Sequence, residues 1–347
     1  MQGIKNHIPY IKYQSRTVLA LVLAFSLSMA ANLAACSQND RGQAQDNGSV
    51  DVRVASLKGP TSIGLISFVN DVENNIVTSP IANYQFAIYG TADEILPQLI
   101  SGTVDIALVP ANVASILYNR TDAGVTVLNI NTLGVLYIVS ADDSINGLSD
   151  LAGRSLLMTG KGSTPEYIMD YLLKTNGLSG QVKLEYKSEA TELAAIISAD
   201  PTAVALLPEP YVSVVTSKDP SLQARISLTD EWRKSQSGGQ LVTGVTLVRN
   251  AFLEEHPDIV AEFIGYHEAS VEFVNNNASA AAEMIVAYGI IDDAEIAAQA
   301  IPRCYLVCLT DEVLQVSLSK YLEVLYDANP ESIGGALPGD GFYYQTK

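Results

Sequence analysis

The feature that most constrains the fold is an internal repeat, in which two segments about a hundred residues apart follow one pattern. Residues 94–115 (EILPQLISGTVDIALVPANVAS) and 192–213 (ELAAIISADPTAVALLPEPYVS) align without a gap at a constant offset of 98 residues. Five positions are identical, among them Pro110 and Pro208. In each copy a helix-like segment leads to a short apolar strand, which stops at the proline and turns into another helix. The repeat therefore predicts two α/β units of one pattern, one in each of two lobes.

A glycine loop leads from a strand into a helix in the second unit. The loop, residues 160–167 (GKGSTPEY), follows the apolar segment 154–159 (RSLLMT). Thr164 stands before a proline and is predicted to cap the helix, while Ser163 with Glu166 fits a capping box. The first N–H groups of such a helix lack partners, so the joint suits an anion or a polar ligand atom. It also fits an ordinary helix start, whose dipole Glu166 would offset.

The first unit contains a similar joint. Residues 59–62 (GPTS) follow the strand-like segment 52–57 (VRVASL). In open α/β sheets ligands bind outside the carboxyl ends of the strands. We therefore expect the joints of the two units to face each other across a cleft.

The N-terminus has the pattern of an exported lipoprotein. Residues 1–35 contain three basic residues and no acid, with an apolar run at 17–31 that is too short to span a membrane comfortably. The run ends in LAAC, which resembles the bacterial lipobox and predicts lipidation of Cys36. Residues 36–50 are polar and are expected to form a flexible tether. These features predict an extracytoplasmic protein attached to the cell membrane through Cys36.

Composition excludes some functions and favours a large globular chain. The 347 residues include 38 acidic and 20 basic ones, and the formal net charge is −18. Nucleic acid is disfavoured as a partner because its backbone demands Lys and Arg. An apolar content of 48% is typical of a globular chain, and the length allows two domains. Cys304 and Cys308 are expected to be small buried thiols, and no spacing predicts a metal site or a cofactor.

The order of elements predicts a discontinuous first lobe, 51–140 with 245–347, and an inserted second lobe, 141–244. The strand 133–139 is expected to end the first part, with one crossing in 140–147 and the return through the strand 241–248. Two crossings permit hinge closure around a ligand. The region around Trp232 is expected to be a polar stretch. The remaining expected elements are helices at 60–70, 91–101, 110–118, 167–173, 257–275, 278–288, 292–300 and 311–326, and strands at 84–89, 105–109 and 303–309.

The sequence resembles the type II periplasmic-binding-protein superfamily. The branch it is most similar to includes binding proteins for nitrate, taurine, alkanesulfonates and thiamine-pyrimidine precursors. The resemblance implies a two-lobed α/β fold and a monomer that hands a small-molecule ligand to an ABC importer permease. It is carried by the segments 54–65 (VASLKGPTSIGL), 105–115 (DIALVPANVAS), 160–167, 207–212 (LPEPYV), 243–249, 257–263 and 333–344 (IGGALPGDGFYY).

The resemblance places the ligand contacts at strand–helix joints. Serine and threonine residues at these joints could instead simply cap helices, and Tyr211 could instead belong to the core. Lys58 and Lys161 also lie at predicted strand ends, but a surface role is the default for a lysine. Arg303, within an apolar segment, is the favoured contact for an ionic ligand. The predicted ligand-binding residues are Thr61, Ser62, Asn112, Ser163, Thr164, Glu209, Tyr211 and Arg303.

These observations predict an extracytoplasmic solute-binding lipoprotein and not an enzyme. Because no basic cluster is apparent, a neutral or zwitterionic ring compound fits the sequence as well as a sulfonate or nitrate. The alternative is an enzyme of the same fold acting on a pyrimidine or a chorismate-derived molecule; a surface adhesin or a sensor's partner forms a third class. After the signal segment only His256 and His267 remain as histidines, and no nucleophile–base pairing or P-loop pattern is visible.

Overall fold

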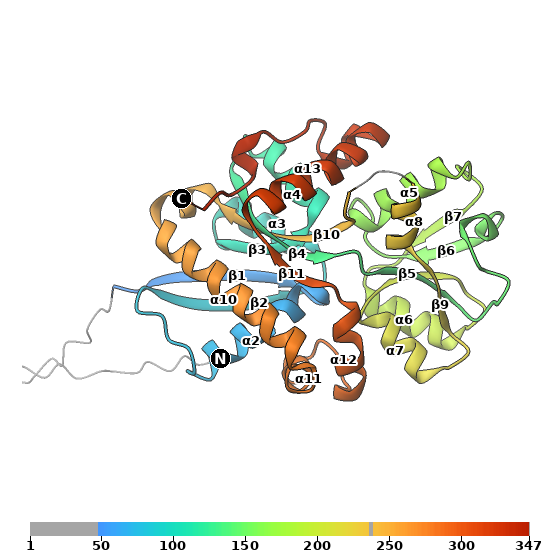
Figure 1. Ribbon diagram of the computed structural model, residues 1–347, viewed down its shortest axis with the longest axis horizontal. Helices are drawn as coiled ribbons and strands as arrows, with labels where there is room; N and C mark the ends of the chain where they lie inside the picture. Colours follow the sequence, from blue (N-terminus) through green and yellow to red (C-terminus); the bar gives the residue numbers. More distant parts are fainter. Residues whose placement is uncertain (1–47, 236–238, 347) are drawn as a thin grey trace, which may run out of the picture. The chain divides into compact units, whose positions relative to one another are not determined.

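The computed structural model describes residues 48–235 and 239–346 (Figure 1). Residues Ser49–Lys347 form one compact unit. The predicted signal peptide, almost all of the tether and the lipidation site Cys36 lie outside the described residues and stay predictions. In the part of the chain that is described, no helix is long and apolar enough to cross a membrane.

Two β-sheets organise this unit, and each defines one lobe (Figure 1). The first sheet takes its strands from the early and late parts of the chain, and the second from the part between them. The first sheet, in spatial order, consists of β11 (Leu306–Leu309), β4 (Val125–Leu133), β10 (Val242–Arg249), β3 (Ile106–Pro110), β1 (Val50–Leu57) and β2 (Ala82–Tyr89). The second consists of β7 (Lys183–Tyr186), β6 (Ser155–Met158), β8 (Ala205–Pro208), β5 (Leu136–Ser140) and β9 (Gln223–Ser227).

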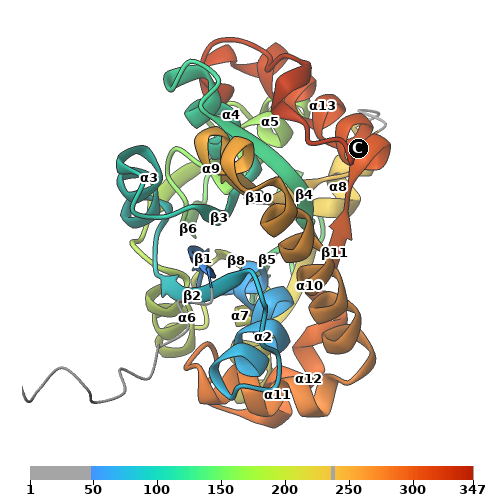
Figure 2. The ribbon, with the colours of Figure 1, turned by 90° about the vertical axis from the view of Figure 1, so that its left-hand side faces the viewer.

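Helices cover both faces of the first sheet. On one face α2 and α10 lie side by side (Figures 1 and 2). Phe68 of α2 and Phe263 of α10 belong to one apolar core. The α/β class is confirmed. The helices of the first lobe are α2 (Pro60–Glu73), α3 (Ala92–Ser101), α4 (Ala111–Arg120), α9 (Asn250–Glu255), α10 (Pro257–Asn276), α11 (Ala278–Ala287), α12 (Ala294–Ala300) and α13 (Asp311–Ala328). Those of the second are α5 (Thr164–Thr175), α6 (Ala190–Ala199), α7 (Tyr211–Lys218) and α8 (Leu228–Lys234). Four 3₁₀ turns join them: η1 (Leu148–Leu151), η2 (Ile301–Arg303), η3 (Pro330–Ile333) and η4 (Asp340–Phe342).

The internal repeat corresponds to one structural unit in each lobe. The first copy forms α3, β3 and the start of α4, and the second forms α6, β8 and the start of α7. The strand ends at the aligned prolines, Pro110 and Pro208, in both. The predicted order of helix, strand and helix is confirmed.

The first passage between the sheets lies earlier than expected. The apolar run predicted as one strand over 133–139 is divided: Leu133 ends β4 of the first sheet, whereas β5 pairs with β8 and β9 in the second. The chain therefore changes sheet at 134–135 and not within 140–147. Gly134 permits this passage, because a Cβ there would lie 2.1 Å from the hydroxyl oxygen of Thr229.

The return passage lies between α8 and β10, since β10 already belongs to the first sheet from Val242. The expected boundary at 244–245 falls inside this strand. The segment expected to be polar contains the helix α8, and the side chain of Trp232 on it is fully buried. Its indole N–H donates a hydrogen bond of 3.1 Å to the carbonyl of Gly239.

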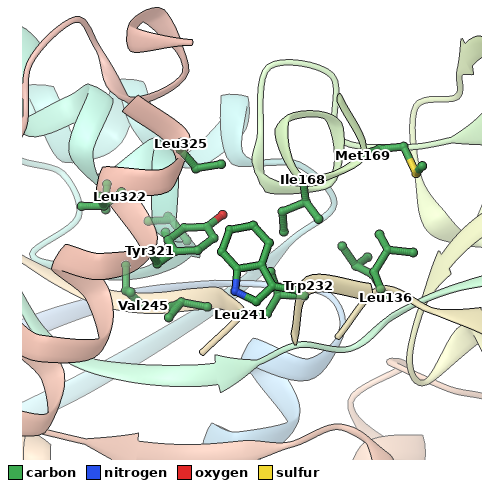
Figure 3. Close-up of a cluster of buried hydrophobic side chains, with 14 of the residues drawn as sticks. Leu136, Ile168, Met169, Trp232, Leu241, Val245, Tyr321, Leu322 and Leu325 are labelled. Carbon is green, nitrogen blue, oxygen red and sulfur yellow. The ribbon is translucent and has the colours of Figure 1, made fainter. Parts of the chain in front are cut away.

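Trp232 is the centre of an apolar cluster that both lobes share (Figure 3). Its ring lies 5.1 Å from that of Tyr171 on α5 and 5.6 Å from that of Tyr321 on α13. Leu136 of β5 and Val245 of β10 belong to the same cluster. The two lobes are thus joined by packed side chains as well as by the two passages of the chain.

Candidate ligand-binding cleft

A cavity of about 680 Å³ lies between the lobes, at the joints that the repeat predicts. The first lobe contributes residues at the ends of β1 and β3 and at the start of α3. The second contributes the loops 159–165 and 187–191, which precede α5 and α6, and the end of β8. We call this space the interlobe cavity.

Three of the eight predicted ligand-binding residues line the interlobe cavity, and five do not. Those in the lining are Ser163, Thr164 and Tyr211. Those outside it are Thr61, Ser62, Asn112, Glu209 and Arg303.

The hydroxyls of Thr61 and Ser62 are used within their own turn. Both donate to the carbonyl oxygen of Leu57, at 2.9 and 2.5 Å, and the Ser62 hydroxyl lies 2.8 Å from that of Ser56. The residue before α2 is Gly59, so neither hydroxyl caps this helix. These groups fix the turn between β1 and α2.

Asn112 ties the two lobes together. Its side chain is fully buried at the start of α4 and donates to the carbonyls of Ser332, at 3.0 Å, and Gly162, at 3.4 Å. Its carbonyl oxygen accepts a hydrogen bond of 3.1 Å from the Thr164 hydroxyl. Because Gly162 and Thr164 belong to the loop and helix of the second lobe and line the cavity, this network connects the two lobes beside it.

We expect Asn112→Ala to lower the free energy of unfolding by about 1–3 kcal/mol, because it leaves the buried Thr164 hydroxyl without its acceptor. Urea denaturation would measure this change. Asn83→Ala, which removes an exposed asparagine on β2, serves as the control and should stay within about 0.5 kcal/mol. Equal effects of the two substitutions would contradict the role given to Asn112.

The start of α5 differs in detail from the prediction. The capping residue is Ser163 rather than Thr164, and its hydroxyl donates to the carbonyl of Gly160 at 2.8 Å. The Glu166 carboxylate accepts from the Gly162 N–H, one residue before the cap, and from the Tyr186 hydroxyl at 2.7 Å. The Glu166 side chain therefore does not form the expected capping box but accepts a hydrogen bond from the loop. The Gly162 N–H is thus already bonded to a carboxylate of the protein itself.

Glu209 and Arg303, predicted separately, lie against each other. The Arg303 Nε is 3.0 Å from Glu209 Oε1, and Oε2 accepts from the N–H and hydroxyl of Ser213 at 3.1 and 2.7 Å. Arg303 also donates to the Ser213 hydroxyl. Burial raises the pKa of Glu209, against the Ser213 hydrogen bonds and the Arg303 charge. The predicted strand at 303–309 is wrong at its start, because Arg303 lies in η2 and β11 begins at Leu306. Through Glu209 and Ser213, Arg303 joins the start of α7 in the second lobe to η2 in the first.

The basic side chains of the cavity were not predicted as a group. Among the described residues, Lys58, Arg120 and Lys187 form no ion pair, and the Lys161 amine lies 5.7 Å from the centre of the Tyr186 ring. The basic residues of the lining are Lys58, Arg120, Lys161 and Lys187. The acidic ones are Asp93, Glu189 and Glu331.

No group of three or more His, Cys, Asp or Glu side chains within 48–235 and 239–346 could hold a metal ion. Neither His256 nor His267 lines the interlobe cavity. His267 is fully buried, and burial lowers its pKa to about 4.

Comparison with known proteins identifies the fold. Residues 81–231 match the family model of the periplasmic substrate-binding protein of phosphonate ABC transporters. No curated protein matches the sequence. Among solved structures, an ABC transporter protein from Parabacteroides distasonis is similar, with a TM-score of 0.70 and 22% identity over 85% of this chain and 99% of that one.

Two sulfonate-binding proteins have the same fold. The periplasmic aliphatic sulphonate binding protein of Escherichia coli gives a TM-score of 0.67 at 12% identity, covering 86% of this chain and 92% of its own. The alkanesulfonate-binding protein of Xanthomonas axonopodis, bound to MOPS, gives 0.63 at 15% identity, covering 83% and 94%. The predicted two-lobed periplasmic-binding-protein fold and the resemblance to substrate-binding proteins of ABC transporters are confirmed.

Proposed function

We propose that this chain is the extracytoplasmic solute-binding component of an ABC-type importer and that its solute is a small anion of the phosphonate or sulfonate class. The observation that carries the proposal is the interlobe cavity with its four basic side chains. The match of residues 81–231 to the phosphonate-binding family model supports the same ligand class. Capture in the cleft, delivery to a permease and attachment through Cys36 belong to the proposal.

The charge of the cavity is opposite to that of the chain. The whole sequence has a formal net charge of −18, whereas four basic residues and three acidic ones line this space. Lys58 and Lys187 come from opposite lobes, and neither is neutralised by an ion pair among the described residues. Charged hydrogen bonds from such groups to a phosphonate or sulfonate oxygen are about twice as strong as neutral ones. A bound anion would therefore be attracted to both lobes at once.

The ties beside the cavity suit a protein that closes on its ligand. The Asn112–Thr164 hydrogen bond and the Glu209–Arg303 pair both connect the lobes. An anion bound between the lobes would add its own contacts to these. The enzyme alternative draws no support from the cavity, since neither His256 nor His267 lines it.

Methylphosphonate and methanesulfonate test the proposal. We expect at least one of them to stabilise the chain from residue 37 onward, by about 2.7 kcal/mol at 100 times its dissociation constant. Lys58→Met and Lys187→Met should each weaken binding about tenfold or more, the value of one charged hydrogen bond. Isothermal titration calorimetry and the shift in melting temperature measure both effects.

Lys183→Met is the matched control. This lysine lies on β7, the strand directly before Lys187, pairs with Glu185 and is 74% exposed. It should leave the affinity unchanged. Tighter binding of a neutral ring compound such as a pyrimidine than of either anion would contradict the proposed ligand class.

A further inference from the structure

A second cavity, of about 280 Å³, lies beside the first and has a different chemical character. Its walls are mainly aliphatic, and the segment joining α11 to α12 contributes Ile290 and Ile291, which are 2% and 5% exposed. We call it the isoleucine cavity. The aliphatic side chains that line it are Ala194, Ala195, Val214, Ile290, Ile291 and Ile296.

The two cavities share a wall. Lys58, Thr191 and Tyr211 line both of them. Of these three residues Tyr211 is buried, with 5% of its surface exposed. A ligand group beside Lys58 in the interlobe cavity would therefore adjoin the aliphatic walls of the isoleucine cavity.

The isoleucine cavity is formed by both lobes, as the interlobe cavity is. Helices α6 and α7 of the second lobe face α12 and the segment before it, and α7 packs directly on α12. The lining also includes Ser198 and three exposed charged residues, Lys218, Asp292 and Asp293. The space thus has an apolar wall and a charged rim, which suits a chain of methylene groups better than a second anionic group.

We propose that the solute is an amphiphilic anion, with its head group at Lys58 in the interlobe cavity and an aliphatic tail that passes Tyr211 into the isoleucine cavity. This inference rests on the proposed function and specifies the class of anion. The residues that line the two cavities would contact different parts of the ligand. Lys58, which lines both cavities, would bind the anionic head group, and Ile290, Ile291 and Ile296 would shield the tail from water.

A homologous series of n-alkylphosphonates, from methyl to hexyl, tests this inference by calorimetry. We expect the dissociation constant to fall about fourfold for each added methylene group until the cavity is full, as for burial of a CH₂ group. If only the methyl compound is tolerated, or if affinity is independent of chain length, the inference is overturned while the proposed function stands. If no member of the series and no matching sulfonate binds, both are overturned.

Substitutions of two alanines on α6 test where the aliphatic tail binds. Ala195 lines the isoleucine cavity and is exposed, so the ring in Ala195→Phe can fill the cavity without disturbing the packing of the core. We expect this variant to abolish the gain in affinity per methylene group. Ala199→Phe places the same ring on an exposed position of α6 outside the cavity and should keep the full gain. The same slope in both variants would show that the tail lies elsewhere and would overturn the inference.

Discussion

Trp232→Ala is expected to lower the free energy of unfolding by about 3–5 kcal/mol, the usual cost of truncating a large buried aromatic side chain. The indole is fully buried, and its neighbours Tyr171 and Tyr321 lie on helices of different lobes. Its removal leaves a void where the two lobes pack on each other. Urea denaturation followed by far-ultraviolet circular dichroism measures the loss, because the variant has no tryptophan fluorescence.

Val313→Ala is the control for this prediction. Val313 lies on α13, as Tyr321 does, but is 52% exposed, so its truncation should change the unfolding free energy by no more than about 0.5 kcal/mol. A loss below about 1 kcal/mol for Trp232→Ala would contradict the role given to the shared cluster in joining the two lobes.

The burial of Trp232 could not be predicted from its neighbours. The segment 229–235 (TDEWRKS) has one large apolar residue among polar ones, which is typical of an exposed stretch. In the structure residues 229–234 belong to α8, whose N-cap Ser227 accepts a hydrogen bond of 3.2 Å from the N–H of Asp230. Only Leu228 and Trp232 are buried on this two-turn helix, and two buried positions give too weak a periodicity to detect.

The elements of the repeat were predictable because their signals are local. Apolar spacing and the aligned prolines define α3, β3, α6 and β8 without knowledge of the rest of the chain. Sheet membership is different, since it depends on pairing between distant strands. The run 133–139 looks the same in either sheet, and only strand pairing divides it: Leu133 ends β4 in the first sheet, whereas β5 pairs with β8 and β9 in the second.

The strand–helix joints were predictable, but the interactions of the residues at them were not, and only Ser163, Thr164 and Tyr211 of the predicted residues line the interlobe cavity. Asn112 and Glu209 were correctly placed at strand–helix joints. The sequence could not reveal that Asn112 accepts from Thr164, or that Glu209 pairs with Arg303, because these contacts join the two lobes. The basic group of the cavity was not predicted for the same reason: Lys58 and Lys187 are far apart in the chain, and only the fold places both in the lining of one cavity.

Arg303→Ala is expected to cost about 3 kcal/mol at pH 8, because it leaves the buried Glu209 carboxylate without its cation. Breaking a buried pair costs about 3–5 kcal/mol, and the lower end applies because the Arg303 side chain is 50% exposed while that of Glu209 is 1% exposed. Arg233→Ala is the matched control. Arg233 pairs with Asp230 at 3.2 Å on the surface, where both side chains are more than half exposed, and such pairs contribute about 0–1 kcal/mol.

The loss of stability caused by Arg303→Ala should increase with pH. Burial already holds the folded pKa of Glu209 above its usual 4.5, and removal of the positive charge raises it further. A carboxyl group whose pKa is higher in the folded state binds more protons there, so stability falls as the pH rises above 4.5 towards the folded pKa. The difference between wild type and variant should therefore be small at pH 4 and largest at pH 8, as measured by urea denaturation at both values. A cost that is the same at both pH values would mean that Arg303 stabilises the contact between α7 and η2 by packing, and not by neutralising Glu209.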